Sequence, residues 1–241
     1  MSLPLFIVYL GVKQDYAAQR LPNTNYFMWG SYDIEKIYEE LESGRMPNED
    51  FVYVTLTSLK DPGDARLAPP GYSNLQIMTL VPREYSLWNV ESGPAEGGQY
   101  HQDGDYRRRK NELAERLITA AERVLPGLRD SIDWKESATP VTQERFTLST
   151  GGTSYGIEFA VDQMGPLRVG PATDVPGLFL AGASTPSGHG IGSVMRSGVQ
   201  AASAILGRNL LRAVIASGDV LGDPTLLPSL DPGFDPWRAS H

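Results

Sequence analysis

The sequence contains no cysteine and only three histidines among its 241 residues. The lack of thiols excludes disulfides, cysteine–zinc sites, iron–sulfur clusters and thiol nucleophiles. The histidines His101, His189 and His241 are scattered, without the close spacing of a paired-histidine motif. The sequence therefore predicts no metal centre.

Long apolar runs are also missing, because no stretch reaches the roughly 20 residues that span a bilayer. The N-terminus shows no charged segment followed by an apolar core and a cleavage site, so no signal peptide is predicted. These absences predict a cytoplasmic protein. They leave peripheral membrane contact open, since contact through a surface patch needs no spanning helix.

Positive charge is scarce, with a formal net charge of -8 at pH 7. An acidic surface repels phosphates, which argues against a nucleic-acid partner. The one basic cluster, over 107–110, is followed by Glu112 and Glu115. This mixture of charges is typical of the solvated face of a helix.

Hydrophobic periodicity and turn residues divide the chain into strands and helices. Apolar and β-branched runs predict strands over 3–12, 25–30, 51–59, 74–82 and 132–138. Helical periodicity and capping residues predict helices over 33–43, 106–125, 191–206 and on to about 217, with a short helix starting at Pro140. These elements predict an α+β fold with a mostly antiparallel or mixed sheet and packed helices.

A glycine-rich turn follows a predicted buried strand over 178–181 and precedes the helix that starts at Ile191. It is not a G-x-G-x-x-G turn, because Ser193 stands at the third glycine position. Small residues let the backbone approach a ligand, and the free N–H groups of a helix start attract electron-rich oxygens. A tight turn that serves packing alone is the alternative, and both interpretations stay open. The predicted apolar side of the helix carries Ile191, Met195, Val199, Ala202 and Leu206.

The segment 175–185, this turn and Ser197-Gly198 resemble the C-terminal flavin motif of the phytoene desaturase family. That family includes carotenoid desaturases, carotenoid isomerases and retinol-saturase-like enzymes, and it is related to the amine oxidases. Weaker similarity extends upstream to four further places. These are Thr139-Pro140 with Glu144-Arg145, the segment 151–156, Arg168, and the loop 69–72.

The resemblance implies a C-terminal part of a FAD-dependent enzyme whose N-terminal dinucleotide-binding half is missing from this chain. The implied cofactor-binding residues are Gly182, Ala183, Ser184, Gly190, Ile191 and Gly192. The first two would approach the pyrophosphate and ribityl chain, and the last three would bring N–H groups to the flavin pyrimidine edge. The chain alone is expected neither to hold FAD tightly nor to be active.

The sequence departs from the family pattern in three places. Related amine oxidases carry an acidic residue at Ala183 that holds the ribityl hydroxyls, which alanine cannot do. Pro186-Ser187 replaces a common His-Pro pair, and His189 interrupts a common run of three glycines. His189 is the one titratable group in the motif. A catalytic acid–base role and a structural or exposed turn role are both open for it.

The resemblance implies desaturation, saturation or isomerisation of a long apolar polyene by hydride exchange with flavin. It assigns 3–146 to a substrate-binding domain and 147–217 to the C-terminal part of the FAD-binding domain, including a closing strand and helix. The residues 218–241 form a tail. Aromatic side chains are candidates to line a substrate tunnel, namely Tyr26, Phe27, Trp29, Tyr53 and Trp88; core packing is the alternative for each.

Two other functions remain open. One is an amine-oxidase-like flavoenzyme on the same scaffold. The other is a non-catalytic module without flavin that binds an apolar ligand or a partner protein. Apolar surface that would face the missing half predicts self-association, with a homodimer as its simplest form.

Overall fold

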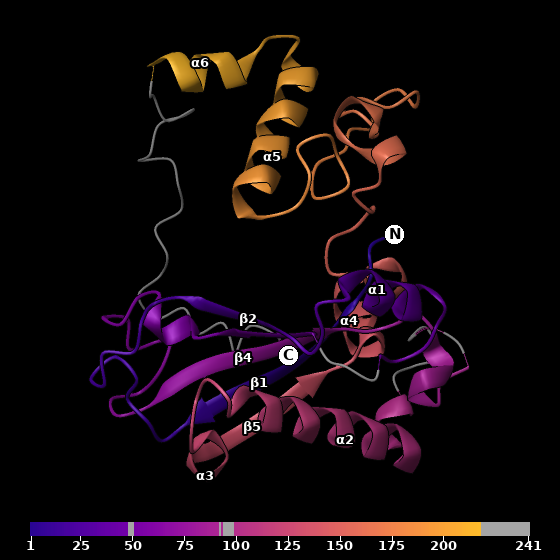
Figure 1. Cartoon of the computed structure of the whole chain (residues 1–241). Coiled ribbons are helices and arrows are strands. Elements are labelled where there is room, and N and C mark those ends of the chain that lie inside the picture. The colour runs from indigo at the N-terminus through magenta and orange to yellow at the C-terminus, as the bar shows by residue number, and fades with distance from the viewer. Residues whose placement is uncertain (48–50, 92, 94–98, 218–241) are drawn as a thin grey trace. The chain divides into compact units, whose positions relative to one another are not determined.

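The computed structural model describes residues 1–47, 51–91, 93 and 99–217 of the chain. These residues belong to two compact units, one up to Phe159 and one from Ala160 onward. The first unit is coloured indigo to salmon and the second orange to yellow in Figure 1. Among the described residues, no helix has the length and apolar character needed to cross a membrane.

A five-stranded sheet forms the centre of the first unit, in the spatial order β2-β3-β4-β1-β5. All four neighbouring pairs are antiparallel. The strands are β1 (Leu5–Val12), β2 (Asn25–Trp29), β3 (Phe51–Thr55), β4 (Ser73–Leu80) and β5 (Ile132–Ala138). The helices are α1 (Ile34–Glu42), α2 (Gly104–Ala121), α3 (Leu128–Ser131) and α4 (Pro140–Thr147). The predicted α+β class and antiparallel sheet are confirmed.

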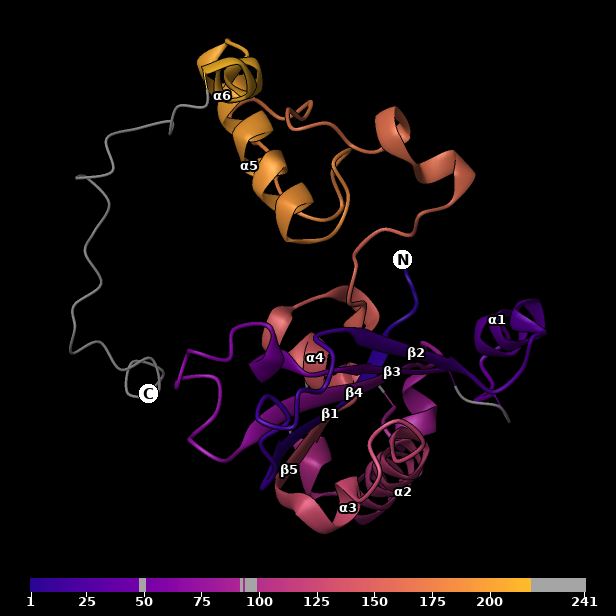
Figure 2. The same cartoon turned by 60° about the vertical axis from the view of Figure 1, so that its left-hand side comes forward.

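One face of the sheet is covered by α2, which runs along it together with α3 (Figure 2). The alternating residues of β1 show which side is the core, because Phe6, Val8 and Leu10 are buried in one cluster with Leu117 and Ile118 of α2. A period of two along a strand places every second side chain on the opposite face. That opposite face carries the aromatic side chains described below.

Capping residues explain where the helices begin. The Asp33 carboxylate accepts a hydrogen bond from the Lys36 N–H at the start of α1, as the sequence predicts. Asp103 does the same for the Tyr106 N–H, so α2 begins at Gly104 and not at the predicted Tyr106. The same helix ends at Ala121, before the predicted end at Leu125.

The predicted strand over 51–59 is too long, because β3 ends at Thr55 and a 3-10 turn follows over Thr57–Leu59. The Ser58 hydroxyl accepts a hydrogen bond from the Asn74 N–H at 3.1 Å. Because the Asn74 N–H is bonded to this side chain, it is not available for a backbone hydrogen bond that would continue the pairing of β3 with β4. The alternation of apolar and polar residues continues past Thr55, so the sequence does not indicate that the strand ends there.

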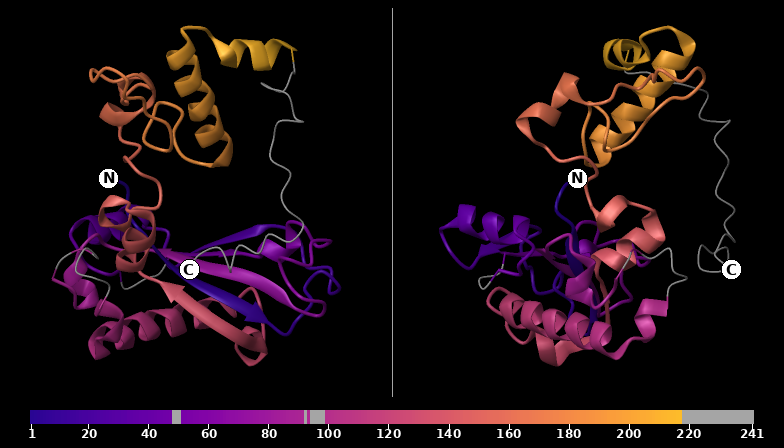
Figure 3. Two further views of the ribbon diagram at one scale, coloured as in Figure 1. Left: turned by 180° about the vertical axis from the view of Figure 1, so that it is seen from behind. Right: turned by 90° about the vertical axis from the view of Figure 1, so that its right-hand side faces the viewer.

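The second unit contains α5 (Ile191–Leu206) and α6 (Leu210–Ser217). Gly207 ends α5 in a left-handed conformation, with φ 63°. The chain then turns sharply into α6 (Figure 3). The observed bounds of α5 match the prediction.

The buried strand predicted over 178–181 is wrong. Phe179 makes one isolated bridge with Ala172, and Leu178 is 48% exposed. A strand needs a ladder of partners, and the described part of the second unit contains no other strand to supply one. The apolar sequence of this segment is typical of a strand whose partners lie outside the unit.

The boundary between the compact units lies after Phe159, beyond the boundary predicted after residue 146. The intervening segment belongs to the first unit, where Thr153 bridges Pro4 and the Gly156 carbonyl accepts from the Ser2 N–H at 2.9 Å. The assignment of substrate-binding and FAD-binding roles to the two parts stays a prediction. The predicted tail over 218–241 lies outside the described residues.

Candidate functional site

The first turn of α5 carries three of the predicted cofactor-binding residues. Gly190 precedes the helix with φ 93° and offers no side chain to cap it. Ile191 and Gly192 form the first turn, and Ile191 is 85% exposed. The first N–H groups of a helix have no acceptor within it, and they lie at the positive end of its dipole. This turn is therefore able to bind an electron-rich oxygen.

The other three predicted residues, 182–184, lie beside the middle of α5. The Gly182 N–H donates to Ser197 Oγ at 2.7 Å, and Ser197 Oγ donates to the Val194 carbonyl at 2.6 Å. Ser197 is 1% exposed, which makes it the buried link between the turn and the helix. The Thr185 hydroxyl closes the turn by donating to the Gly182 carbonyl at 2.8 Å.

Arg168 holds the same turn from the other side. Its side chain is buried, with 5% of the residue exposed. Nη1 donates to the Ala183 carbonyl at 2.7 Å and Nε donates to the Gln163 carbonyl at 2.8 Å. Hydrogen bonds from a charged donor are stronger than neutral ones. Arg168 thus fixes the backbone of the turn. The sequence resemblance included the position of Arg168 but assigned it no role.

The six predicted residues consequently form two groups and not one. Ser197 lies six residues after Ile191, so at a rise of 1.5 Å per residue the two are about 9 Å apart along the helix axis. Both groups leave room for a ligand, because a Cβ added at Gly182, Gly190 or Gly192 would meet no atom of the chain within 4 Å. Two open backbone surfaces at this spacing fit an elongated ligand. His189 is exposed directly before Gly190, and its catalytic role stays a prediction.

The upstream segments that carry the resemblance hold α4 in place. The Thr139 hydroxyl caps α4 and lies 2.9 Å from the Tyr106 hydroxyl. The Tyr85 hydroxyl donates to the Glu144 carboxylate. Burial, followed by this hydrogen bond, raises the pKa of Tyr85 to about 12. These residues therefore perform a structural task in the first unit.

Aromatic side chains gather on the face of the sheet opposite α2. Phe27 of β2 and Tyr53 of β3 are register partners, with ring centroids 4.5 Å apart. Trp29 and Phe51 are the next such pair, with centroids 4.4 Å apart. Phe27 is 62% exposed. Trp29, Phe51 and Tyr53 are half-buried, so Phe27 is the exposed ring of this cluster. An exposed ring stacked on its neighbours offers apolar area that suits a flat ligand.

Two of the five aromatic candidates do not lie on this surface. Tyr26 packs against the core beneath the sheet, one residue out of phase with Phe27. Trp88 is 3% exposed and stacks on Phe6 at 5.6 Å. The core interpretation is correct for these two residues. Phe27 and Tyr53 lie on the opposite face of the sheet, and Trp29, on the same face, packs against the cluster of Leu3, Ile37 and Leu41.

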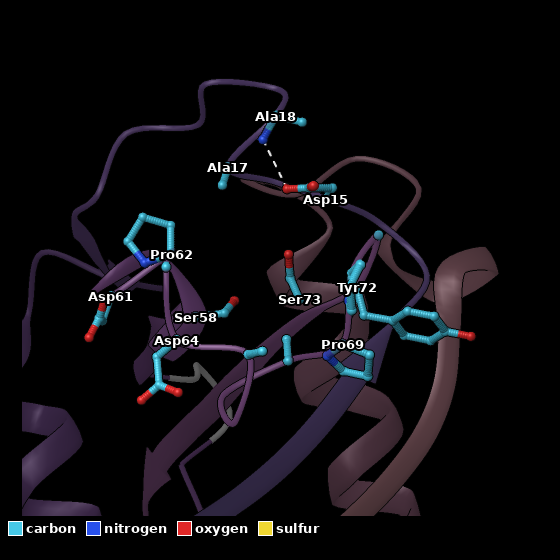
Figure 4. Close-up of a pocket in the computed structure, with 15 residues that line it drawn as sticks. Asp15, Ala17, Ala18, Ser58, Asp61, Pro62, Asp64, Pro69, Tyr72 and Ser73 are labelled. Atoms are coloured by element: carbon cyan, nitrogen blue, oxygen red, sulfur yellow. Dashed lines mark hydrogen bonds between the residues drawn. The ribbon is translucent and has the colours of Figure 1, made fainter.

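A hollow of about 480 Å³ lies between the loops that contain Asp15, Asp61 and Asp64. Figure 4 shows that these carboxylates do not converge on a common point. Asp15 accepts from the Ala18 N–H at 2.9 Å, and Asp64 pairs with Arg66 at 2.6 Å. The hydrogen bonds from Arg66 lower the pKa of Asp64 to about 2. Among the described residues, no group of acidic and histidine side chains could hold a metal ion.

Comparison with known proteins gives matches over most of the chain. Residues 76–206 match the family model for flavin containing amine oxidoreductases, a range that includes Arg168 and the turn of α5. The 4,4'-diapolycopen-4-al dehydrogenase of Metabacillus indicus is 31% identical over 83% of this chain and 36% of its own length. The all-trans-retinol 13,14-reductase of Danio rerio is 22% identical over 87% of this chain and 34% of its own.

A further relative is the lycopene-forming phytoene desaturase of Pseudescherichia vulneris. It is 25% identical over 86% of this chain and 38% of its own length. The chain thus spans about a third of the length of each of these three relatives.

Proposed function

The chain belongs to the flavin-containing amine oxidoreductase family, and from this premise we propose that it forms the C-terminal part of a FAD-dependent oxidoreductase acting on a long apolar polyene. Relatives named for a diapolycopenal, a retinol and phytoene support this substrate class. The observation that carries the flavin part is the uncapped, open first turn of α5 within the matched segment.

The residues of the second unit fit a bound FAD in two places. The first-turn N–H groups at 190–192 would donate to electron-rich oxygens of the flavin ring, and the backbone at 182–184 would lie against the pyrophosphate and ribityl chain. Arg168 would keep the latter backbone in position through the Ala183 carbonyl. When bound, FAD supplies the hydride chemistry, while the protein supplies binding and orientation.

FAD binding by this chain needs a further contribution. The sequence contains no G-x-G-x-x-G turn, and Ala183 offers no carboxylate to the ribityl hydroxyls. We therefore expect the 241-residue chain to bind FAD more weakly than micromolar. Full affinity would require a dinucleotide-binding part that carries such a turn, either joined to this chain or separate from it.

The open face of the sheet would contact the polyene. Its aromatic pairs are preformed and Phe27 is 62% exposed, so binding an apolar ligand there would remove the Phe27 ring from water. The rows of the sheet extend this apolar character, because Tyr53 is the register partner of Met78 and Met78 that of Ile7. Met78 is only 8% exposed, so the exposed part of this apolar row lies on β2 and β3.

Replacing Phe27 by alanine tests the substrate part of the proposal. All-trans-retinol fluorescence, titrated with the chain, should show affinity weakened by about tenfold, because a partly buried phenyl ring contributes 1–2 kcal/mol. Tyr32→Ala is the matched control, since Tyr32 is fully exposed outside the sheet. Equal retinol affinity of the two variants would remove the sheet face from the substrate site.

A further inference from the structure

A cavity of about 520 Å³ lies in the first unit, between the N-terminal half of α2, the edge strand β5 and α4. Its volume lies within the range of small-molecule sites. Tyr9, Tyr100 and Phe146 give it apolar walls. Phe146 is 74% exposed, although it is a large apolar side chain. The cavity therefore offers apolar contact area that the described part of the chain leaves uncovered.

The charges in this cavity are not balanced. Lys110 and Glu136 neutralise one another through an ion pair of 3.0 Å. Arg145 lies in the same cavity, and no carboxylate in the described ranges pairs with it. Its guanidinium carbon lies 5.3 Å from the ring centroid of Phe146 and 6.0 Å from that of Tyr100. A cation between aromatic rings that pairs with no described carboxylate stands out in a chain with net charge -8.

We propose that this cavity binds the carboxylate end of an elongated apolar molecule. Arg145 contacts the carboxylate, because a guanidinium matches the two oxygens of that group. Tyr9, Tyr100 and Phe146 pack along the apolar chain next to it. The proposal rests on the proposed function and deepens it, by assigning the polyene an acidic end group.

A titration with cis-parinaric acid, a polyene fatty acid whose fluorescence rises in apolar surroundings, tests the proposal on the 241-residue chain. Arg145→Gln should weaken binding of the acid about fivefold, as expected for an ion pair made by an exposed arginine. The methyl ester should bind equally to the parent chain and to this variant. Phe146→Ala should weaken binding of both the acid and the ester.

Arg123→Gln is the matched control, because it removes the same charge from an exposed residue beyond the far end of α2. Equal affinity of the Arg145 and Arg123 variants for the acid, or the absence of saturable binding, would overturn the proposal. If retinol binding still depended on Phe27, the proposed function would stand without the acidic end group.

Competition distinguishes two sources of the carboxylate. Displacement of cis-parinaric acid by all-trans-retinoic acid at lower concentration than by palmitic acid supports a polyene acid. Displacement by palmitic acid alone would overturn the polyene assignment and would point to a fatty acid from lipid.

Discussion

Gly152→Ala is expected to lower the free energy of unfolding of the first unit by about 3 kcal/mol. A Cβ at this position would lie 2.1 Å from the carbonyl oxygen of Pro140 and 2.6 Å from its carbonyl carbon. Both atoms are backbone at the start of α4, so neither can move without displacing the helix. Gly152 also has φ +65°, a backbone conformation that residues with a side chain rarely adopt.

Gly151→Ala separates the steric clash with Pro140 from the backbone strain. Gly151 has nearly the same φ, +66°, and an added Cβ there meets nothing within 4 Å. The control should cost only the left-handed strain of about 1 kcal/mol. Urea unfolding followed by tryptophan fluorescence measures both variants. Equal losses would show that the contact with Pro140 does not constrain this turn.

Gly192→Val is expected to reduce flavin retention at least tenfold in the complete flavin-loaded protein, while the fold of α5 stays intact. An added Cβ would meet no atom of the chain within 4 Å, and the φ of Gly192 lies outside the left-handed region. Valine is also no worse than glycine as a helix residue. A loss of flavin would therefore report a steric clash with the cofactor and not a damaged helix.

Gly198→Val is the control for this second substitution. Gly198 lies on the same helix, and a Cβ there is also free of contacts within 4 Å. Flavin retention is read from the absorbance near 450 nm after gel filtration, with circular dichroism to monitor the helix. Full retention by the Gly192 variant would show that the first turn of α5 is not at the cofactor.

Local signals in the sequence were sufficient for much of the fold. The bounds of β5 and α5 follow from Ala138, where the strand gives way to the Thr139 cap, and from Gly190 and Gly207, which flank the helix. Capping residues and glycines act within a few positions, so a sequence states them directly. The strand prediction over 178–181 was wrong because a strand needs neighbouring strands to pair with. The composition of a segment does not reveal whether such neighbours are present.

Less of the candidate site could be predicted from the sequence. Alternation places Tyr26 and Phe27 on opposite faces, but only the packing of α2 decides which face is the core. The resemblance pointed to Arg168 and Ser197, yet their bonds to Ala183 and Gly182 depend on how the loop folds back onto α5. Arg145 belongs to a motif that the resemblance includes, but the sequence does not show that no described carboxylate pairs with it; that depends on the arrangement of its neighbours.

Hydrogen exchange at the first turn of α5 tests the central claim most directly. In the complete protein, the amide protons of Ile191, Gly192 and Ser193 should exchange at least tenfold more slowly with FAD bound than after its removal, because the cofactor would accept their hydrogen bonds. The amide of Gly198, within the helix, should change little. Equal exchange rates at 191–193 with and without FAD would contradict the assignment of this turn to the flavin site.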